Sequence, residues 1–113
     1  MEFLREVHFP MDEPTLTGAQ KTFLRGLGQR LEPTLKVGKG GLTPAFFSEL
    51  QRNLHASELV KLRFLGADRD ERATFCDTIA ATGRCACIGA VGHTALFYLP
   101  NPDSAARRID LPE

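Results

Sequence analysis

The stretch VGKGGLTP, from Val37 to Pro44, combines residue types that bind anions. Its glycines let a ligand approach the backbone closely, and Lys39 adds a mobile cation at the tip. Thr43 suits the N-cap of a helix and Pro44 suits the first helical position, so a helix is expected to begin here. Because a helix N-terminus carries unpaired N–H groups and a partial positive charge, the stretch has the ingredients of a phosphate-binding loop.

The spacing of the glycines shows which known phosphate-binding motifs the loop matches. It matches neither the nucleotide-hydrolysis pattern GxxxxGK[ST] nor the dinucleotide pattern GxGxxG, because the glycines fall at 38, 40 and 41. It matches GxxG, with Gly38 and Gly41 at the ends and Lys39 and Gly40 between them. A loop of this pattern clamps a nucleic-acid backbone in KH domains. The alternative is a tight strand-to-helix turn that binds no ligand.

The distribution of charge favours a polyanionic partner, although basic and acidic residues balance at 14 each. Residues 1–16 hold one basic and four acidic residues, whereas residues 17–47 hold five basic residues and one acid. Local fields rather than the net charge steer a polyanion. The five basic residues join the glycine loop as candidate nucleic-acid contacts, and they are Lys21, Arg25, Arg30, Lys36 and Lys39.

A helix that begins after Thr17 is expected to carry part of this cationic surface. Thr17 and Gln20 have the spacing of a capping box. The apolar stripe of the helix is expected to face the core and consists of Phe23, Leu24, Leu27 and Leu31. Lys21 and Arg25 lie off this stripe. If the helix packs beside the strand that precedes the glycine loop, its basic residues and Lys39 form one surface, which would bind a polyanion in a salt-dependent way.

The remaining elements alternate between strands and helices. The second and third helices are expected to begin near Thr43 and Asp68, and the third is expected to close at Gly83 as its C-cap glycine. The expected strands are residues 34–37, 58–65, 85–91 and 94–99. The order α-β-α-β-α-β-β predicts an α/β chain of the two-layer α+β type with a four-stranded mixed sheet.

Length and composition indicate one globular domain. The chain has 113 residues, of which 42% are hydrophobic and 25% charged. We expect an acidic N-terminal extension at 1–16, a single domain at 17–100 and a C-terminal tail at 101–113. No apolar run approaches ~20 residues, and the first residues lack the features of a signal peptide, so we expect a cytoplasmic protein that does not contact membranes.

The sequence predicts no catalytic site, no metal and no cofactor. Cys76, Cys85 and Cys87 have no zinc-binding spacing and are expected to stay reduced. The serines lie in no recognisable nucleophile motif, and no small-molecule substrate is expected. A less favoured alternative is a small enzyme that holds a phosphorylated substrate on the glycine loop and uses Cys85 or Cys87. That alternative predicts a thiol with a low pKa.

Five segments follow one another without large gaps between about Thr17 and Pro112. They are LRGLGQRLEPTLKVGKGGLTPAF, SELVKLRF, ATG at 81–83, VGHTALFYLP and RRIDLP. Together they resemble the YhbY/CRM family of RNA-binding domains. The resemblance implies a fold like the C-terminal domain of bacterial initiation factor three with an added N-terminal helix, and it implies an RNA-binding role. Stand-alone bacterial members look like factors associated with precursors of the large ribosomal subunit.

We therefore expect a non-enzymatic, monomeric protein that contacts ribosomal RNA through the loop Gly38–Gly41 and the adjacent basic helix. The leading alternative is a protein-interaction module that docks on ribosomal proteins. The chain differs from the family pattern at Gly40, Gly89 and Leu99, where Asn, Gln and Arg are common in the family. The sequence leaves open the contributions of His93, Tyr98, Arg107 and Arg108.

Overall fold

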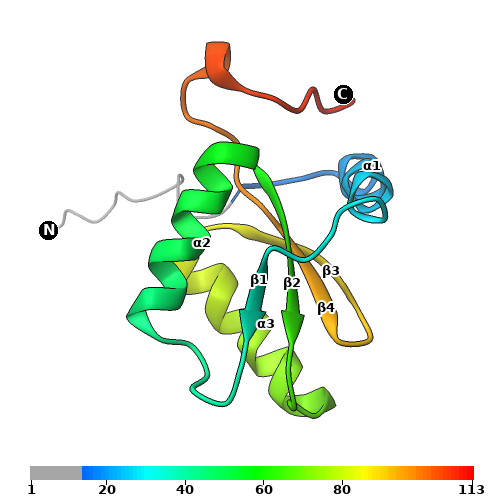
Figure 1. The fold of residues 1–113 in the computed structure, drawn as a ribbon. Helices are drawn as coiled ribbons and strands as arrows, with labels where there is room; N and C mark the ends of the chain where they lie inside the picture. Colours follow the sequence, from blue (N-terminus) through cyan, green and yellow to red (C-terminus); the bar gives the residue numbers. More distant parts are fainter. Residues whose placement is uncertain (1–13) are drawn as a thin grey trace, which may run out of the picture.

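The computed structural model describes residues 14–113 (Figure 1). The helices are α1 (Gly18–Gly28), α2 (Pro44–Ser57), α3 (Arg69–Gly83) and the short 3₁₀ helix η2 (Ser104–Ala106). The strands are β1 (Leu35–Val37), β2 (Leu59–Phe64), β3 (Ala86–Val91) and β4 (Thr94–Tyr98). The acidic extension predicted for residues 1–16 lies almost wholly outside the described residues.

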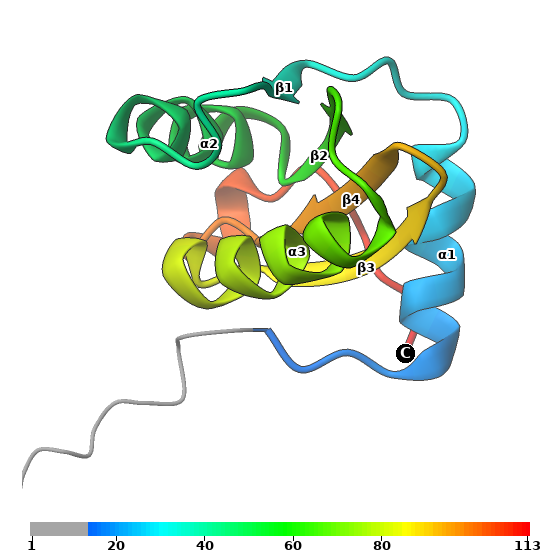
Figure 2. The ribbon, with the colours of Figure 1, turned by 90° about the horizontal axis from the view of Figure 1, so that it is seen from below.

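The four strands form one mixed sheet in the order β1-β2-β4-β3. β1 pairs with β2 in parallel, and β4 pairs antiparallel with both β2 and β3. Helices α2 and α3 cover one face of the sheet, and α1 covers the other (Figure 2). The predicted element order and the four-stranded mixed sheet are therefore confirmed.

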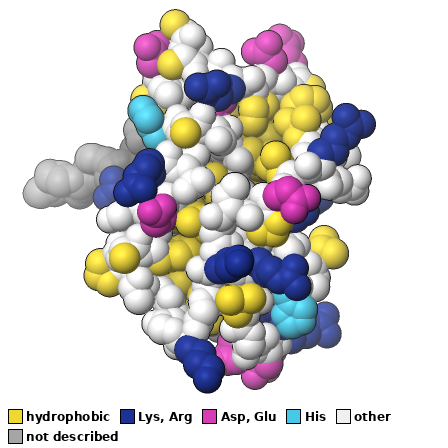
Figure 3. Space-filling model, viewed as in Figure 1, with side chains coloured by type: hydrophobic (Ala, Val, Ile, Leu, Met, Phe, Trp, Pro, Cys, Tyr) yellow, Lys and Arg dark blue, Asp and Glu magenta, His cyan; other side chains and the backbone are white. Residues whose placement is uncertain are grey.

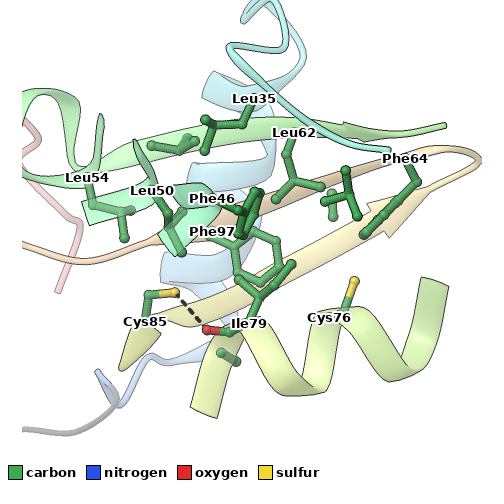
Figure 4. Close-up of a cluster of buried hydrophobic side chains, with 14 residues drawn as sticks. Leu35, Phe46, Leu50, Leu54, Leu62, Phe64, Cys76, Ile79, Cys85 and Phe97 are labelled. Carbon is green, nitrogen blue, oxygen red and sulfur yellow. Dashed lines mark hydrogen bonds between the residues drawn. The ribbon is translucent and has the colours of Figure 1, made fainter. Parts of the chain in front are cut away.

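The larger hydrophobic core fills the space between the sheet and helices α2 and α3 (Figure 4). Leu50, Leu62, Ile79 and Phe97 are completely buried there. Along β2, alternate residues point to opposite faces, and Leu62 shares the core face with its neighbours two residues away. This alternation was predicted from the sequence, and it turns the lysine and the arginine of β2 to the α1 face of the sheet.

The smaller core lies between α1 and the other face of the sheet and consists of Leu24, Leu59, Ala86, Ile88, Leu96 and Tyr98. The prediction that Phe23, Leu27 and Leu31 face the core is wrong, because these side chains are 39%, 37% and 37% exposed. The helix instead turns Leu24 and Gly28 to the sheet. Residues four apart share a helix face, so a small residue at position 28 lets the end of α1 approach the strands closely.

We expect Gly28→Ala to lower the free energy of unfolding by about 1–3 kcal/mol. A Cβ at this position would overlap the side chain of Leu96 in the smaller core. The matched control is Gly26→Ala on the same helix, where no atom lies within 4 Å of the added methyl group. That change should raise the free energy of unfolding by about 0.5–1 kcal/mol. Urea denaturation measures both, and equal effects would contradict this packing of α1.

The helix termini follow the predicted capping pattern at the N-terminal ends. Capping boxes form between Thr17 and Gln20 at α1 and between Asp68 and Glu71 at α3. The prediction for the end of α3 is wrong in detail, because the left-handed residue is Arg84, with φ of 54°, and not Gly83. Gly83 is helical and buried, and a Cβ there would lie 3.0 Å from a methyl carbon of Leu50.

Glu58, between α2 and β2, holds the C-terminal segment against the domain. Glu58 is 1% exposed, and its backbone φ is 68°. One carboxylate oxygen accepts hydrogen bonds from the N–H groups of Arg108 at 2.8 Å and Ile109 at 2.9 Å. The other oxygen accepts from Asn101 at 2.6 Å. Residues 101–113, predicted as a tail, are therefore anchored by one buried carboxylate.

Candidate nucleic-acid interface

The glycine loop is a tight turn that is held at both ends. The N–H of Gly41 donates to the carbonyl of Gly38 at 3.0 Å, and Gly41 has φ of 69°, which glycine adopts without strain. On the strand side, the N–H of Leu65 donates to the carbonyl of Val37 at 2.8 Å. Lys39 is exposed and stands within this turn. The fold therefore presents the lysine on a backbone whose conformation is already fixed.

The start of α2 offers fewer donors than the sequence implied. Thr43 is the N-cap and Pro44 occupies the first turn, as predicted. Pro44 has no N–H, and the side chain of Thr43 already accepts from the N–H of Phe46 at 3.0 Å. Within residues 14–113, the N–H groups of Lys39 and Gly40 have no hydrogen-bond acceptor. The turn therefore offers the N–H groups of Lys39 and Gly40, and the helix start adds that of Ala45, which donates no hydrogen bond within residues 14–113.

Clefts open on both sides of the loop. One, of about 600 Å³, lies between the loop and the start of α3, and its lining includes Leu65, Phe75 and Glu71. The other, of about 330 Å³, lies toward α2, and its lining includes Lys36 and Glu49. Each cleft therefore contains one acid. The acid in each cleft offsets part of the positive charge of the lysine that lines the same cleft.

The structure separates the five predicted cations into two groups. Near the loop are Lys36 and Lys39, and on or just after α1 are Lys21, Arg25 and Arg30. The helix packs on β2, β3 and β4 through the smaller core. Arg25 Nε donates to the carbonyl of Ile88 on β3 at 3.2 Å, and β3 is the edge strand farthest from β1. The condition under which one surface was expected, that the first helix packs beside the first strand, is therefore not met.

Two cations that sequence reasoning missed lie in the gap between the two groups. Lys61 and Arg63 of β2 share the α1 face of the sheet, and Arg63 pairs in register with Lys36 of the neighbouring strand. Lys61 Nζ donates to the carbonyl of Gly28 at 3.2 Å, so it reaches the end of α1. Neighbouring strands are about 4.8 Å apart, which brings the charges close together. We name Lys36, Arg63, Lys61 and Arg25 the cationic row.

Further basic groups lie near the carboxyl ends of β1 and β2. Arg72, in the first turns of α3, lies 3.5 Å from the ring of His93 in the β3–β4 turn, measured from Nη1 to Nδ1. The carbonyl of His93 accepts from the N–H of Phe64 at 2.7 Å, which fixes the turn beside β2. Figure 3 shows Lys and Arg side chains gathered with a His over this part of the molecule. For Lys61 and Arg63, the sequence did contain a usable signal: the alternation of SELVKLRF already placed both cations on one face of the strand.

Tyr98 and Arg107, whose contributions the sequence left open, both have structural roles. Tyr98 is 1% exposed in the smaller core, so its ring is not available to stack on a base. Burial raises the pKa of the Tyr98 hydroxyl, and the nearby charge of Glu58 raises it further. Arg107 Nε donates to the carbonyl of Asn101 at 2.9 Å and so helps to fold the C-terminal segment.

Two of the three cysteines, Cys76 and Cys85, are buried. Cys85 is completely buried, and its Sγ lies 3.8 Å from the carbonyl of Ile79. The pKa of Cys76 is raised by a hydrogen bond with Cys87 and by burial. In the described part of the chain, no group of three His, Cys, Asp or Glu side chains could hold a metal ion. Nor does any described helix have the length and apolar character needed to cross a membrane.

The domain is of the α+β class, with three helices on a four-stranded mixed sheet and a glycine turn beside a cationic row. The model of the CRS1 / YhbY (CRM) domain matches residues 16–98. The chain belongs to this family. The resemblance stated from the sequence motifs is therefore confirmed.

Relatives of similar length carry RNA-binding names. The chain is 33% identical over 98 residues to an RNA-binding protein of Haemophilus influenzae, covering 87% of this chain and 96% of that one. It is 37% identical over 87 residues to a protein of Pseudomonas aeruginosa named as a probable RNA-binding protein, covering 77% and 84%. The solution structure of a hypothetical Staphylococcus aureus protein, described as a putative RNA-binding protein, superposes with a TM-score of 0.73 at 26% identity. The match covers 87% of this chain and all of that one.

Proposed function

We propose that this protein binds RNA through its backbone, with the glycine loop and the cationic row as the contact surface. The observation that carries the proposal is the pair Gly38 and Gly40. Neither has a positive φ, no atom lies within 4 Å of a Cβ added at Gly38, and the nearest to one at Gly40 is a methyl carbon of Thr43 at 3.8 Å. Within the loop, only Gly41 has a backbone conformation that favours glycine, so on this proposal the other two glycines serve a ligand that approaches the backbone.

The charges next to the loop support an RNA strand as that ligand. Lys36, Lys39 and Arg63 are all exposed, and Lys36 lies two residues before the start of the turn. The relatives are named as RNA-binding proteins, which agrees with this reading. The finer proposal is ribosomal RNA in a precursor of the large ribosomal subunit, as the resemblance to stand-alone bacterial members implies. On this proposal the protein acts as a monomer in the cytoplasm and catalyses no reaction.

We expect Gly38→Ala and Gly40→Ala each to weaken RNA binding by at least about fivefold without destabilising the protein. A methyl group would keep a phosphate away from the N–H groups of the turn, and one lost hydrogen bond is worth about 1 kcal/mol. The same changes should leave the free energy of unfolding unchanged or raise it by up to about 1 kcal/mol, because alanine restricts the unfolded chain. Fluorescence anisotropy with a ribosomal RNA fragment and urea denaturation give the two quantities.

The matched control is Gly18→Ala at the start of α1, where the added methyl group also meets no atom within 4 Å. It should leave RNA affinity unchanged. If both loop variants bound RNA as tightly as the unchanged protein, the turn would be purely structural and the proposal would fail.

A second candidate function is favoured by the exposed stripe on α1. Phe23, Leu27 and Leu31 follow one another at intervals of four residues, so they lie along one side of the helix and the turn after it. Such a stripe suits a protein contact, for example with a ribosomal protein. Phe23→Ser with Leu27→Ser should abolish cosedimentation with RNase-treated ribosomal proteins if this function holds. Cosedimentation that survives the double change would exclude the stripe as the contact.

A further inference from the structure

A cavity of about 310 Å³ lies between the end of α1 and the β3–β4 hairpin, separate from the clefts at the glycine loop. Its lining includes two cations, Arg25 and Lys61, and no acid. Gly89 and Thr94 also line it. The volume falls within the range of pockets that hold small molecules, and the unbalanced positive charge favours an anionic group.

Both cations are held in place by the backbone. Arg25 Nε donates to the carbonyl of Ile88, and Lys61 Nζ donates to the carbonyl of Gly28, each at 3.2 Å. Each side chain uses one donor in this way and keeps others, since a guanidinium has five N–H groups and an ammonium three. A phosphate between them would meet oriented donors, so less side-chain entropy is lost on binding.

A bulge in β3 creates the space for this arrangement. The register of β3 on β4 shifts between Cys87 and Gly89, and Gly89 pairs with Leu96. The extra residue, Ile88, presents its carbonyl to Arg25. A Cβ at Gly89 would lie 3.2 Å from Arg25 Nε, so a larger side chain would displace the guanidinium and enter the cavity. The cavity therefore depends on the absence of a side chain at one position.

The register of the sheet connects this cavity to the glycine loop. Lys36 of β1 pairs with Arg63 of β2, and Arg63 pairs with Thr94 of β4, which lines the cavity. The path from the loop across the sheet is therefore lined by cations. We propose that the cavity takes one nucleotide of the bound RNA, with its phosphate between Arg25 and Lys61. This inference rests on the proposed function, because it extends the same RNA surface to a second contact.

Nuclear magnetic resonance on the full ¹⁵N-labelled chain separates the two contacts. Signals from Gly89, Thr94 and the Arg25 Nε–H report on the cavity, and signals from Lys39 and Gly41 report on the loop. A single-stranded RNA oligonucleotide should shift both groups. Uridine monophosphate at millimolar concentration should shift the cavity signals, and inorganic phosphate should shift them less. Equal shifts with phosphate would overturn the assignment of a nucleotide and leave a simple anion site.

The outcomes distinguish this inference from the proposed function. If the oligonucleotide shifts the loop signals alone, the cavity proposal fails and the loop proposal stands. If it shifts the cavity signals alone, the loop proposal fails and the cavity proposal stands. If it shifts neither group, both fail.

Two variants test the cavity by affinity. Lys61→Met removes one cation, and Gly89→Leu fills the space and displaces Arg25. Each should weaken RNA binding about tenfold while the loop signals still shift with RNA. The matched control is Arg52→Met, which removes one charge from α2 on the opposite side of the sheet and should change affinity less than about twofold. Unchanged affinity in both cavity variants, with intact folding by thermal denaturation, would overturn the proposal.

Discussion

Glu58→Ala is expected to lower the free energy of unfolding by about 3 kcal/mol or more. The substitution removes the acceptor of three backbone N–H groups, those of Asn101, Arg108 and Ile109. A partly buried donor that loses its acceptor costs about 1 kcal/mol or more, because water does not fully replace the bond. The left-handed backbone at Glu58 adds no compensation, since alanine is strained there as well. Urea denaturation measures the loss, and faster amide exchange at Arg108 and Ile109 locates it in the C-terminal segment.

Two further variants make this prediction specific. Glu58→Gln keeps one accepting oxygen but turns an NH₂ group toward a backbone donor, so an intermediate loss is expected. Glu49→Ala removes an acid of the same type from the surface, where it pairs with Arg52 at 2.9 Å and both side chains are about half exposed or more. That loss should stay below about 0.5 kcal/mol. Equal losses in Glu49→Ala and Glu58→Ala would show that the buried carboxylate does not anchor the segment.

The largest expected effect on binding comes from reversing three charges together. In a variant with Lys36→Glu, Lys39→Glu and Arg63→Glu, RNA affinity should fall by about 1000-fold at moderate salt, since each lost phosphate contact costs roughly tenfold. The fold should survive, because all three side chains are exposed. Anisotropy titration with a ribosomal RNA fragment measures the affinity, and circular dichroism checks the fold.

The control is Arg52→Glu, a single charge reversal away from the proposed surface, to be compared with the single reversal Lys39→Glu. Arg52 has 70% side-chain exposure and lies on α2, across the sheet from the cationic row. Its reversal should change RNA affinity by less than about threefold through the net charge alone. If Arg52→Glu weakened binding as much as Lys39→Glu does, attraction would depend on total charge and no local surface would be required.

Local signals in the sequence predicted local structure well. The capping boxes at Thr17 and Asp68 and the N-cap at Thr43 all form, because each depends on residues within one helical turn. The alternation in β2 was also readable, since side chains on a strand point to opposite faces with a period of two. The mixed four-stranded sheet followed from the order of the elements and from the short turn between the last two strands.

Features that depend on contacts between distant segments could not be read in this way. The apolar residues of α1 predicted a buried stripe, but Leu96 of β4 selects Gly28 and Leu24 for the buried face. Glu58 read as an ordinary strand-start residue, because its partners lie 43 to 51 residues further along the chain. Lys61 and Arg63 gained a place at the candidate site only when the register of the sheet joined them to Lys36 and to the end of α1.

On the proposed function, the protein grips an RNA backbone with Lys39 and the turn Gly38–Gly41. The most direct test is the dependence of RNA affinity on salt for the unchanged protein and for Lys39→Glu. The logarithm of the association constant should fall linearly with the logarithm of salt concentration. The magnitude of this slope should be smaller by about 0.7–0.9 in the variant, which is the contribution of one phosphate contact. Identical slopes for the two proteins would contradict the claim and make the loop a structural turn.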